Sequence, residues 1–412
     1  MTAGMGRAQR RARVLGALAV AASWSVLFVG AAQPAAADTQ SKQWYLSAMQ
    51  AEDMWKVTTG EGIKVAVVDT GVNSSTTSLQ GQVLKGVDVT GASGDETDDY
   101  DGHGTTMAEL IAGTGKGGGL KGLAPGAKII PVRMSDADLM KKRSTIFSDS
   151  ADAIRAAADS DAQIISMSFG SESPESSEHE AVEYAESRGK LFLASIGNAG
   201  DRDNTQSYPG SYAEAVGVAS ADRKGKVSYY SSHSDAVDIA SPGSDVPRWC
   251  DSSFKSYCDG DGGTSAATAI ASASAALVWS LHPDWTANQV LNVLFDTASR
   301  DWKDGERSKY LGHGLIRPSM NVLKGKGNPG APDISPLTKE RTTGPAGSSE
   351  KPADSASEQP AKNGAEADKP VAAEETKSSG DESQLGLILG VAAVVVVLGG
   401  VAYAVVRRRK AA

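Results

Sequence analysis

Short apolar segments alternate with longer segments of helical spacing through the middle of the chain. The apolar segments are rich in valine, isoleucine and alanine and are short enough for buried strands; they cover residues 64–68, 128–132, 164–167, 191–194 and 215–219. Alanine-rich patterns predict helices over residues 105–113, 148–159, 179–188 and 264–281. This alternation predicts an α/β fold, a doubly wound and mainly parallel sheet with helices on both faces. We expect its functional site at the carboxyl ends of the strands.

The beginning of the chain has a different pattern, in which basic residues precede an apolar run. Arginines at positions 7, 10, 11 and 13 come before an apolar segment over residues 14–29, and three alanines follow at 35–37. This order is typical of a secretory signal peptide, which we expect over residues 1–37 with cleavage before Asp38. An N-terminal membrane anchor is the alternative, and in either case the residues that follow leave the cytoplasm.

A second uncharged apolar run covers residues 385–406 and is followed at once by basic residues at 407–410. At about 1.5 Å per residue, a helix over this run can cross a hydrocarbon core of about 30 Å. Positive charge stays on the cytoplasmic side of a membrane. The sequence therefore predicts a single-pass transmembrane helix over 385–406, a basic cytoplasmic tail over 407–412 and an extracytoplasmic domain before them, with a buried core helix as the alternative.

Composition divides the remaining chain. Residues 325–384 are dominated by proline, alanine, glutamate, lysine, serine and glycine, so we expect a disordered stalk. Residues 38–324 then form one globular domain with a short N-terminal extension. The net charge of -9 and the isoelectric point near 5.2 argue against nucleic acid as a partner.

Cys250 and Cys258 are the two cysteines of the chain, and the predicted topology puts both outside the cytoplasm. We expect a disulfide between them, which would hold a surface loop. No other cysteine and no nearby histidine completes a metal site with this pair, so the sequence predicts no metal ion.

Three glycine-containing segments each carry one reactive side chain. They are residues 67–71 with Asp69, 101–105 with His103 and 262–266 with Ser265. Asp69 ends a predicted strand, and the other two begin predicted helices, so the three side chains can converge on one cleft. Acyl transfer by serine requires an imidazole that takes the hydroxyl proton and a carboxylate that orients the imidazole. Taken singly, each residue could instead be a helix cap, a turn residue or, for Asp69, a metal ligand.

The order aspartate, histidine, serine resembles the subtilisin family, and the resemblance extends over the whole predicted domain. Residues 165–170 are similar to the family's substrate-binding strand and 195–198 to its oxyanion segment, and further segments match in order at 207–210, 240–243 and 282–286. The resemblance implies a serine endopeptidase of polypeptides with a catalytic triad of Asp69, His103 and Ser265. It implies no cofactor, and a need for calcium is left open.

The same resemblance implies roles for further residues. Asn198 would donate its side-chain amide to the oxyanion, together with the backbone N–H of Ser265. The peptide bond between Tyr208 and Pro209 would be cis. The residues that would contact substrate are Ser168, Phe169, Gly170, Ser195 and Gly197.

Some residues depart from the family pattern or compete with it. The family follows its serine with methionine and, shortly afterwards, proline and histidine, whereas alanines follow Ser265, and Thr106 replaces a second histidine. Both departures lower the activity we expect without removing a catalytic atom. His313 also lies between glycines, where we expect a surface turn. An acidic run at 95–101 ends two residues before His103; we expect Asp99 and Asp101 to attract basic substrate side chains, and a solvated acidic loop or a cation site is the alternative.

The stalk, the anchor, the single disulfide and the short extension resemble those of the mycosins, membrane-anchored proteases associated with type VII secretion in actinobacteria. That resemblance implies a protease at the cell membrane that processes exported proteins and has secretion components as partners. A membrane-side scaffold with weak or vestigial protease activity is the alternative function.

Overall fold

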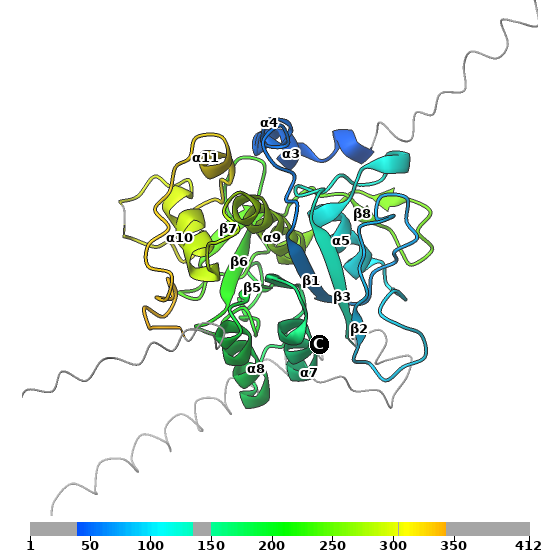
Figure 1. Cartoon of the computed structure of the whole chain (residues 1–412), viewed down its shortest axis with the longest axis horizontal. Helices are drawn as coiled ribbons and strands as arrows, with labels where there is room; N and C mark the ends of the chain where they lie inside the picture. Colours follow the sequence, from blue (N-terminus) through cyan, green and yellow to red (C-terminus); the bar gives the residue numbers. More distant parts are fainter. Residues whose placement is uncertain (1–38, 135–149, 304, 343–412) are drawn as a thin grey trace, which may run out of the picture. The chain divides into compact units, whose positions relative to one another are not determined.

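The computed structural model describes residues 39–134, 150–303 and 305–342. Seven strands form one sheet in the order β2-β3-β1-β4-β5-β6-β7, and all neighbouring strands are parallel (Figure 1). The strands are β1 (Lys64–Asp69), β2 (Val87–Asp88), β3 (Lys128–Arg133), β4 (Ile164–Met167), β5 (Leu191–Ser195), β6 (Val216–Ala221) and β7 (Ile239–Pro242). The five strands expected from the sequence are present within two residues of the predicted bounds, and the predicted α/β fold class is confirmed.

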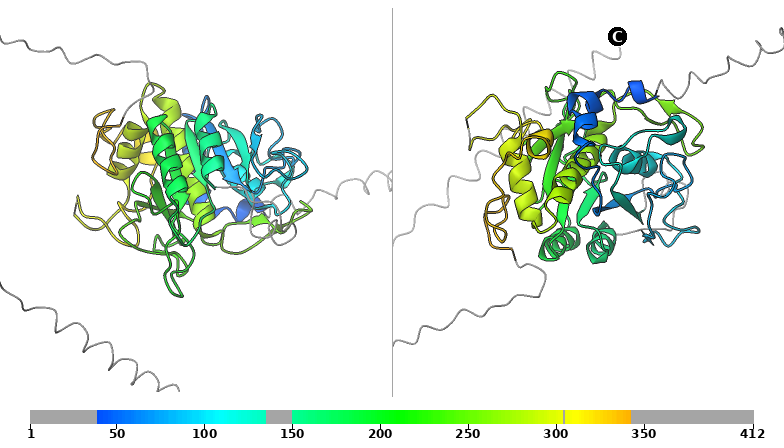
Figure 2. Two further views of the ribbon diagram at one scale, coloured as in Figure 1. Left: turned by 90° about the horizontal axis from the view of Figure 1, so that it is seen from below. Right: turned by 45° about the horizontal axis from the view of Figure 1, so that its top comes forward.

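Helices cover both faces of this sheet. The longer ones are α5 (His103–Ala112), α7 (Ser150–Asp159), α8 (Ser176–Ser187), α9 (Gly263–Leu281) and α10 (Ala287–Thr297). Short helical segments complete the set: α3 (Trp44–Ala48), α4 (Ala51–Met54), η1 (Lys116–Gly118) and α11 (Ser319–Val322). Figure 2 shows α7 and α8, in green, side by side on one face of the sheet.

The alternation of side chains along β1 explains why two separate cores form. Val65 and Val67 belong to the core that contains α5, α9 and α10, whereas Ala66 and Val68 belong to the core that contains α7 and α8. Successive residues of a strand point to opposite faces of a sheet. An apolar run without polar interruption is therefore what a strand covered on both faces requires.

Helix α9 lies at the centre of the larger core. Its residues from Thr264 to Trp279 are all buried, and most of them are alanine or serine, which lets the helix approach the sheet closely. Among the described residues, α9 is the one helix long and apolar enough to cross a membrane, and its burial identifies it as a core helix. The predicted signal peptide, transmembrane helix and cytoplasmic tail lie outside the described residues.

A small antiparallel hairpin carries the two cysteines. It consists of β8 (Arg248–Trp249) and β9 (Tyr257–Cys258). Cys250 and Cys258 are joined by a disulfide with their Cα atoms 5.0 Å apart, as predicted. The hairpin contacts α5, where the Tyr257 hydroxyl donates a hydrogen bond of 2.7 Å to the Glu109 carboxylate.

Residues 325–342 pack against the domain, although the sequence predicted that the stalk begins at 325. Leu337 contacts the core and Ser335 is buried. Asn288 of α10 donates from Nδ2 to the hydroxyl of Thr342 at 2.8 Å, and Thr286 donates to the Pro332 carbonyl at 2.8 Å. The folded domain therefore continues past the boundary predicted at 324. Composition alone marks this polar segment as unable to fold, but side chains at and within α10 form hydrogen bonds with it. The rest of the predicted stalk lies outside the described residues.

Candidate active site

The carboxyl end of β1 and the first turn of α5 bring Asp69 and His103 together. The Nδ1 atom of His103 lies 2.8 Å from Oδ1 of Asp69, which is 1% exposed. The backbone N–H of Thr70 donates to the same oxygen at 2.8 Å. Because Nδ1 is engaged with the carboxylate, the other ring nitrogen, Nε2, is left for reacting groups. This is the orientation in which an imidazole can act as a general base.

Charges around His103 favour its protonated form. Burial lowers the pKa of the imidazole, but the charge and the hydrogen bond of Asp69 outweigh it, with smaller contributions from Asp101 and Asp99. Their balance raises the pKa of His103 to about 9. The ring also lies 5.5 Å from the ring of Phe169, measured between centroids.

Asp99 fixes the start of the helix that carries His103. Its buried carboxylate accepts hydrogen bonds from the backbone N–H groups of Gly102 at 2.8 Å and Thr105 at 2.9 Å. It also accepts from the hydroxyl of Thr70 at 2.8 Å. Gly102 has a φ of 94°, a conformation that favours glycine. The expectation that Asp99 attracts basic substrates is wrong, because its carboxylate is buried and both of its oxygens accept hydrogen bonds inside the protein.

Ser265 is the third residue of α9 and is 8% exposed. Its hydroxyl donates to the carbonyl of Ser168, just beyond β4, at 3.4 Å. Within the described ranges there is no hydrogen bond between His103 and Ser265. Both side chains nevertheless contact the same short segment, since His103 neighbours Phe169 and Ser265 bonds to Ser168. A hydrogen bond between a catalytic base and its nucleophile is often long before substrate binds and tightens in the complex.

Asn198 lies beside the beginning of α9 and is held there by Thr264. The backbone N–H and the hydroxyl of Thr264 both reach Oδ1 of Asn198, at 2.9 and 3.1 Å. This assigns Oδ1 as an acceptor and leaves Nδ2 as a donor next to the helix N-terminus. A Cβ atom on Gly263 would lie 3.2 Å from Nδ2. Thr264 was not among the residues predicted for the site, although its position directly before Ser265 was a usable signal.

The residues predicted to contact substrate lie together after two neighbouring strands. β4 and β5 pair in parallel, so Ser168 to Gly170 and Ser195 to Gly197 share one edge of the sheet. The Ser195 hydroxyl donates to the Ser168 carbonyl at 3.3 Å. A Cβ atom on Gly170 would collide with Ser207 and with the Tyr208 carbonyl, so the backbone approach there requires glycine.

A loop that contacts these substrate-binding segments contains the Tyr208-Pro209 bond, which is cis as predicted. Its backbone pairs with the segment after β4, because the N–H of Ser171 donates to the Tyr208 carbonyl at 2.8 Å and the N–H of Tyr208 donates back at 2.9 Å.

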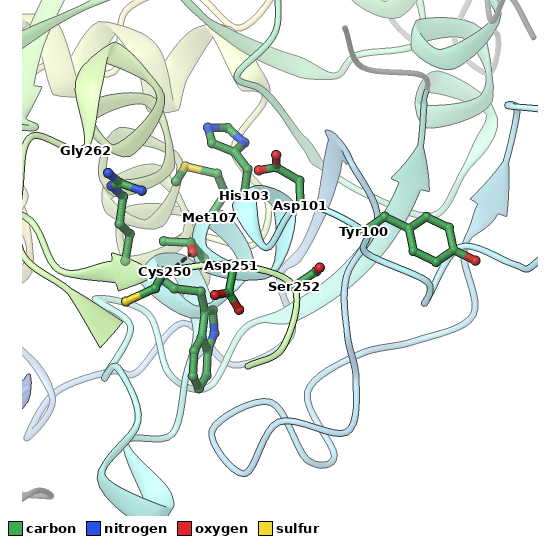
Figure 3. Close-up of a pocket in the computed structure, with 11 residues that line it drawn as sticks. Tyr100, Asp101, His103, Met107, Cys250, Asp251, Ser252 and Gly262 are labelled. Carbon is green, nitrogen blue, oxygen red and sulfur yellow. Dashed lines mark hydrogen bonds between the residues drawn. The ribbon is translucent and has the colours of Figure 1, made fainter. Parts of the chain in front are cut away.

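A pocket of about 340 Å³ opens on the α5 side of His103 (Figure 3). Its walls come from the loop before α5, from α5 itself and from the disulfide hairpin. The lining residues include Asp101, His103, Met107, Trp249 and Asp251. A group held here would therefore lie against the histidine on the hairpin side.

The other histidines lie elsewhere. His313 is in a turn, as predicted, but it is half-buried rather than on the surface, because its ring stacks on Phe295 with centroids 4.0 Å apart. Burial lowers the pKa of His313 to about 4. It is therefore a neutral packing residue.

Comparison with known proteins agrees with this geometry. The model of the subtilase family, Peptidase S8, matches residues 60–314. Thermitase of Thermoactinomyces vulgaris is 35% identical over 206 residues, which cover 50% of this chain and 71% of that protein. Subtilisin BL of Lederbergia lenta is 34% identical over 266 residues, which cover 63% of this chain and 92% of that protein.

A solved structure described as a serine protease MycP1, an essential component of the type VII (ESX-1) secretion system, is similar as well. It is 27% identical with a TM-score of 0.57, and the match covers 68% of this chain and 88% of that one. The predicted resemblance to subtilisins and mycosins is confirmed. With more than half of its residues matched by the family model, this chain belongs to the subtilase family of serine endopeptidases.

Proposed function

We propose that this chain hydrolyses peptide bonds with Ser265 as nucleophile, His103 as general base and Asp69 as the carboxylate that orients the base. The observation that carries the proposal is the 2.8 Å contact between Asp69 and His103 at the carboxyl end of β1. An imidazole fixed in this way can accept the Ser265 proton at Nε2 while Oγ attacks the substrate carbonyl. His103 then returns the proton to the leaving amine, and water releases the acyl group by the same steps.

The oxyanion of the tetrahedral intermediate would face Asn198 Nδ2 and the backbone N–H of Ser265. Thr264 supports this role, because its two bonds to Oδ1 turn the amide donor outward. Fixed donors of this kind need no reorganisation during the reaction. Losing one such donor costs about 100- to 1,000-fold in turnover, a magnitude measured on subtilisin itself.

The two sides of the cleft would hold the two sides of the substrate. The segments 168–170 and 195–197 would bind the acyl side, since Ser265 contacts Ser168. The pocket between α5 and the hairpin would receive residues after the cleaved bond, because His103 gives its proton to the leaving amine and lines this pocket.

We further propose that the protease acts at the extracytoplasmic face of a cell membrane and processes exported proteins. The support is the order of predicted signal peptide, domain and predicted membrane-spanning run in the sequence, together with the similarity to MycP1, whose description names a type VII secretion system. A scaffold with a vestigial site is the second candidate, favoured by the lack of a hydrogen bond between the described His103 and Ser265.

Labelling with a fluorophosphonate tests the two candidates against each other. This probe reacts with serines that a neighbouring base activates. In the full-length protein we expect label on Ser265, found by peptide mass spectrometry, and none in His103→Ala. A folded protein that takes up no label would support the scaffold, and label on another serine would overturn the assignment of the nucleophile.

A further inference from the structure

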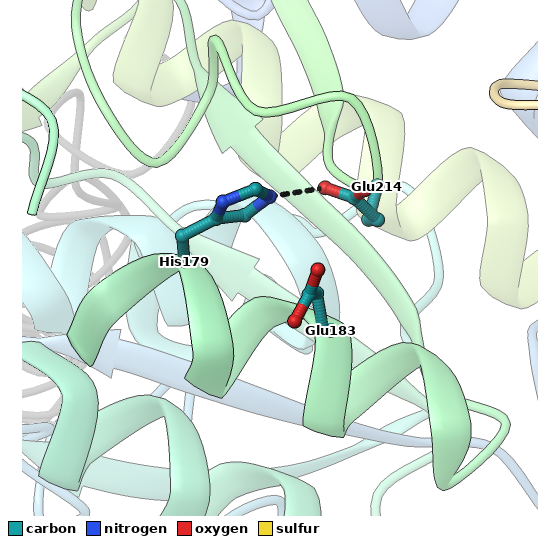
Figure 4. Close-up of side chains that lie close together, drawn as sticks. All are labelled: His179, Glu183 and Glu214. Atoms are coloured by element: carbon teal, nitrogen blue, oxygen red, sulfur yellow. Dashed lines mark hydrogen bonds and ion pairs between the residues drawn. The ribbon is translucent and has the colours of Figure 1, made fainter. Parts of the chain in front are cut away.

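Three metal-ligating side chains meet on the α8 face, away from the triad (Figure 4). His179 and Glu183 are four residues apart on α8, so they project from the same side of the helix. Glu214 reaches them from the loop before β6, and its Oε2 lies 2.8 Å from Nε2 of His179. One ligand atom from each of the three lies within 4.8 Å of the other two.

Packing around the cluster holds its frame in place. The His179 ring stacks on Tyr212 with centroids 4.5 Å apart and an interplanar angle of 8°. The Tyr212 hydroxyl donates to the Glu175 carbonyl at 3.0 Å and accepts from the Glu175 N–H at 2.9 Å. Because Glu175 precedes α8 and Tyr212 precedes Glu214, these bonds tie the two ligand-bearing segments together.

The charges of the cluster are unbalanced. Among the described residues, no lysine or arginine forms an ion pair with Glu183 or Glu214. Burial raises the pKa of the neighbouring Glu186, and the charges of Glu214 and Glu183 raise it further. Two carboxylates therefore lie with one imidazole within 4.8 Å of one another, and a bound cation would relieve the repulsion between their negative charges.

We propose that His179, Glu183 and Glu214 bind a divalent transition metal ion, with zinc as the best match. One imidazole nitrogen and two carboxylate oxygens are ligands that zinc accepts, with a fourth position left for water. Calcium and magnesium prefer oxygen ligands throughout, so the imidazole disfavours them. Zinc ligands at about 2.0–2.2 Å lie roughly 3.4 Å from one another. Zinc would displace the proton that His179 and Glu214 share, so that these two atoms part from 2.8 Å to that spacing, and the exposed Glu183 side chain can rotate to meet it.

A metal ion here would join α8 to the loop that pairs with the end of the predicted substrate-binding segment, residues 168–170. Residues 207–215 carry both Glu214 and Tyr208, and Tyr208 pairs with Ser171 through two backbone hydrogen bonds. Ser171 follows directly on Gly170, at the predicted acyl-binding segment. The ion would thus be a structural metal ion that links α8 to this loop and stabilises the fold around the cleft, without taking part in the reaction.

Zinc titration of the chelator-treated full-length protein tests the site. By calorimetry we expect one zinc ion per chain, a higher melting temperature with zinc, and binding at least about tenfold weaker in Glu183→Gln. Glu180→Gln is the matched control, because it makes the same charge change on the same helix, where Glu180 pairs with Arg155 at 3.8 Å. This control should bind zinc as the wild type does.

Glu183→Gln also separates the metal site from a simple ion pair, because it leaves the bond between His179 and Glu214 intact. Equal zinc affinity in wild type and Glu183→Gln would overturn the proposal, and so would no binding by the wild type. Calcium that binds as tightly as zinc would overturn the assignment to a transition metal. Zinc bound at His103 would affect both proteins alike, so the difference between them reports on the α8 cluster.

Discussion

At the scale of single residues, the acidic side chains around His103 have different tasks that the sequence does not distinguish. The Asp69 motif was recognisable because of its position after a strand. Asp99 and Asp101 look alike within the acidic run at 95–101, but Asp99 is 6% exposed and caps α5, whereas Asp101 is exposed and lines the pocket. Burial, which one sequence does not reveal for a loop, decides between a structural and a surface carboxylate.

Asp99→Asn should destabilise the protein and lower kcat/KM. The asparagine amide replaces one carboxylate oxygen by an NH₂ group, which cannot accept the hydrogen bonds that this oxygen now accepts. A buried donor left without an acceptor costs about 1–3 kcal/mol. Urea unfolding measures the loss. Asp101→Asn is the control and should lower the unfolding free energy clearly less than Asp99→Asn does, because Asp101 is exposed. Equal losses in the two variants would contradict the capping role.

The raised pKa of His103 predicts an alkaline protease. Below this pKa the imidazole is protonated and cannot accept the Ser265 proton, so kcat/KM should rise with pH toward a midpoint near 9. Asp69→Asn removes the charge that raises the pKa. Its residual activity should therefore show a lower midpoint, besides a rate loss on the order of 10⁴-fold. A wild-type midpoint at or below 6.5, or the same midpoint in both proteins, would count against this account.

At the scale of elements, α5 connects the candidate catalytic histidine to the disulfide hairpin. Sequence analysis predicted both the helix and the disulfide but not their connection, because a glutamate in a helix is expected to face solvent. In the structure nine of the ten residues of α5 are buried. Glu109 is among them, and it accepts hydrogen bonds from Tyr257 and Thr76. A hairpin inserted across the outer side of the helix covers what would otherwise be its polar face.

Glu109→Gln should change how stability depends on pH. Burial raises the pKa of Glu109 to about 7, while bonds from Tyr257 and Thr76 partly oppose the shift. Since the folded pKa exceeds the ordinary value of 4.5, the wild type loses stability from this group as pH rises from 4.5 to 7. Glutamine cannot ionise, and hydroxyls can accept from its amide. The melting temperature of Glu109→Gln should thus rise relative to that of the wild type as pH increases from 4.5 to 7. A difference in melting temperature that stays constant over this range would contradict the raised pKa.

At the scale of the whole molecule, the sequence predicted what repeats along the chain and missed what is brief or locally supported. Uninterrupted apolar runs identified five strands, whereas β2 has two residues and no pattern to detect. Residues 325–342 escaped prediction because their order depends on side chains of α10. The triad segments could be recognised since each combines a reactive side chain with glycines. The supporting role of Asp99 could not, because it depends on burial of a loop residue, and the bonds from Thr264 to Asn198 join residues 66 apart in the sequence.

Peptide hydrolysis by Ser265→Ala tests the central claim most directly. The substitution removes the proposed nucleophile oxygen and opens little space, so the fold should persist. We expect kcat to fall by about 10⁶-fold, the magnitude measured on subtilisin itself. Ser272→Ala, at another buried serine of α9, is the matched control and should keep wild-type activity. Substantial hydrolysis by folded Ser265→Ala, with Ser272→Ala unchanged, would contradict the assignment of Ser265 as the nucleophile.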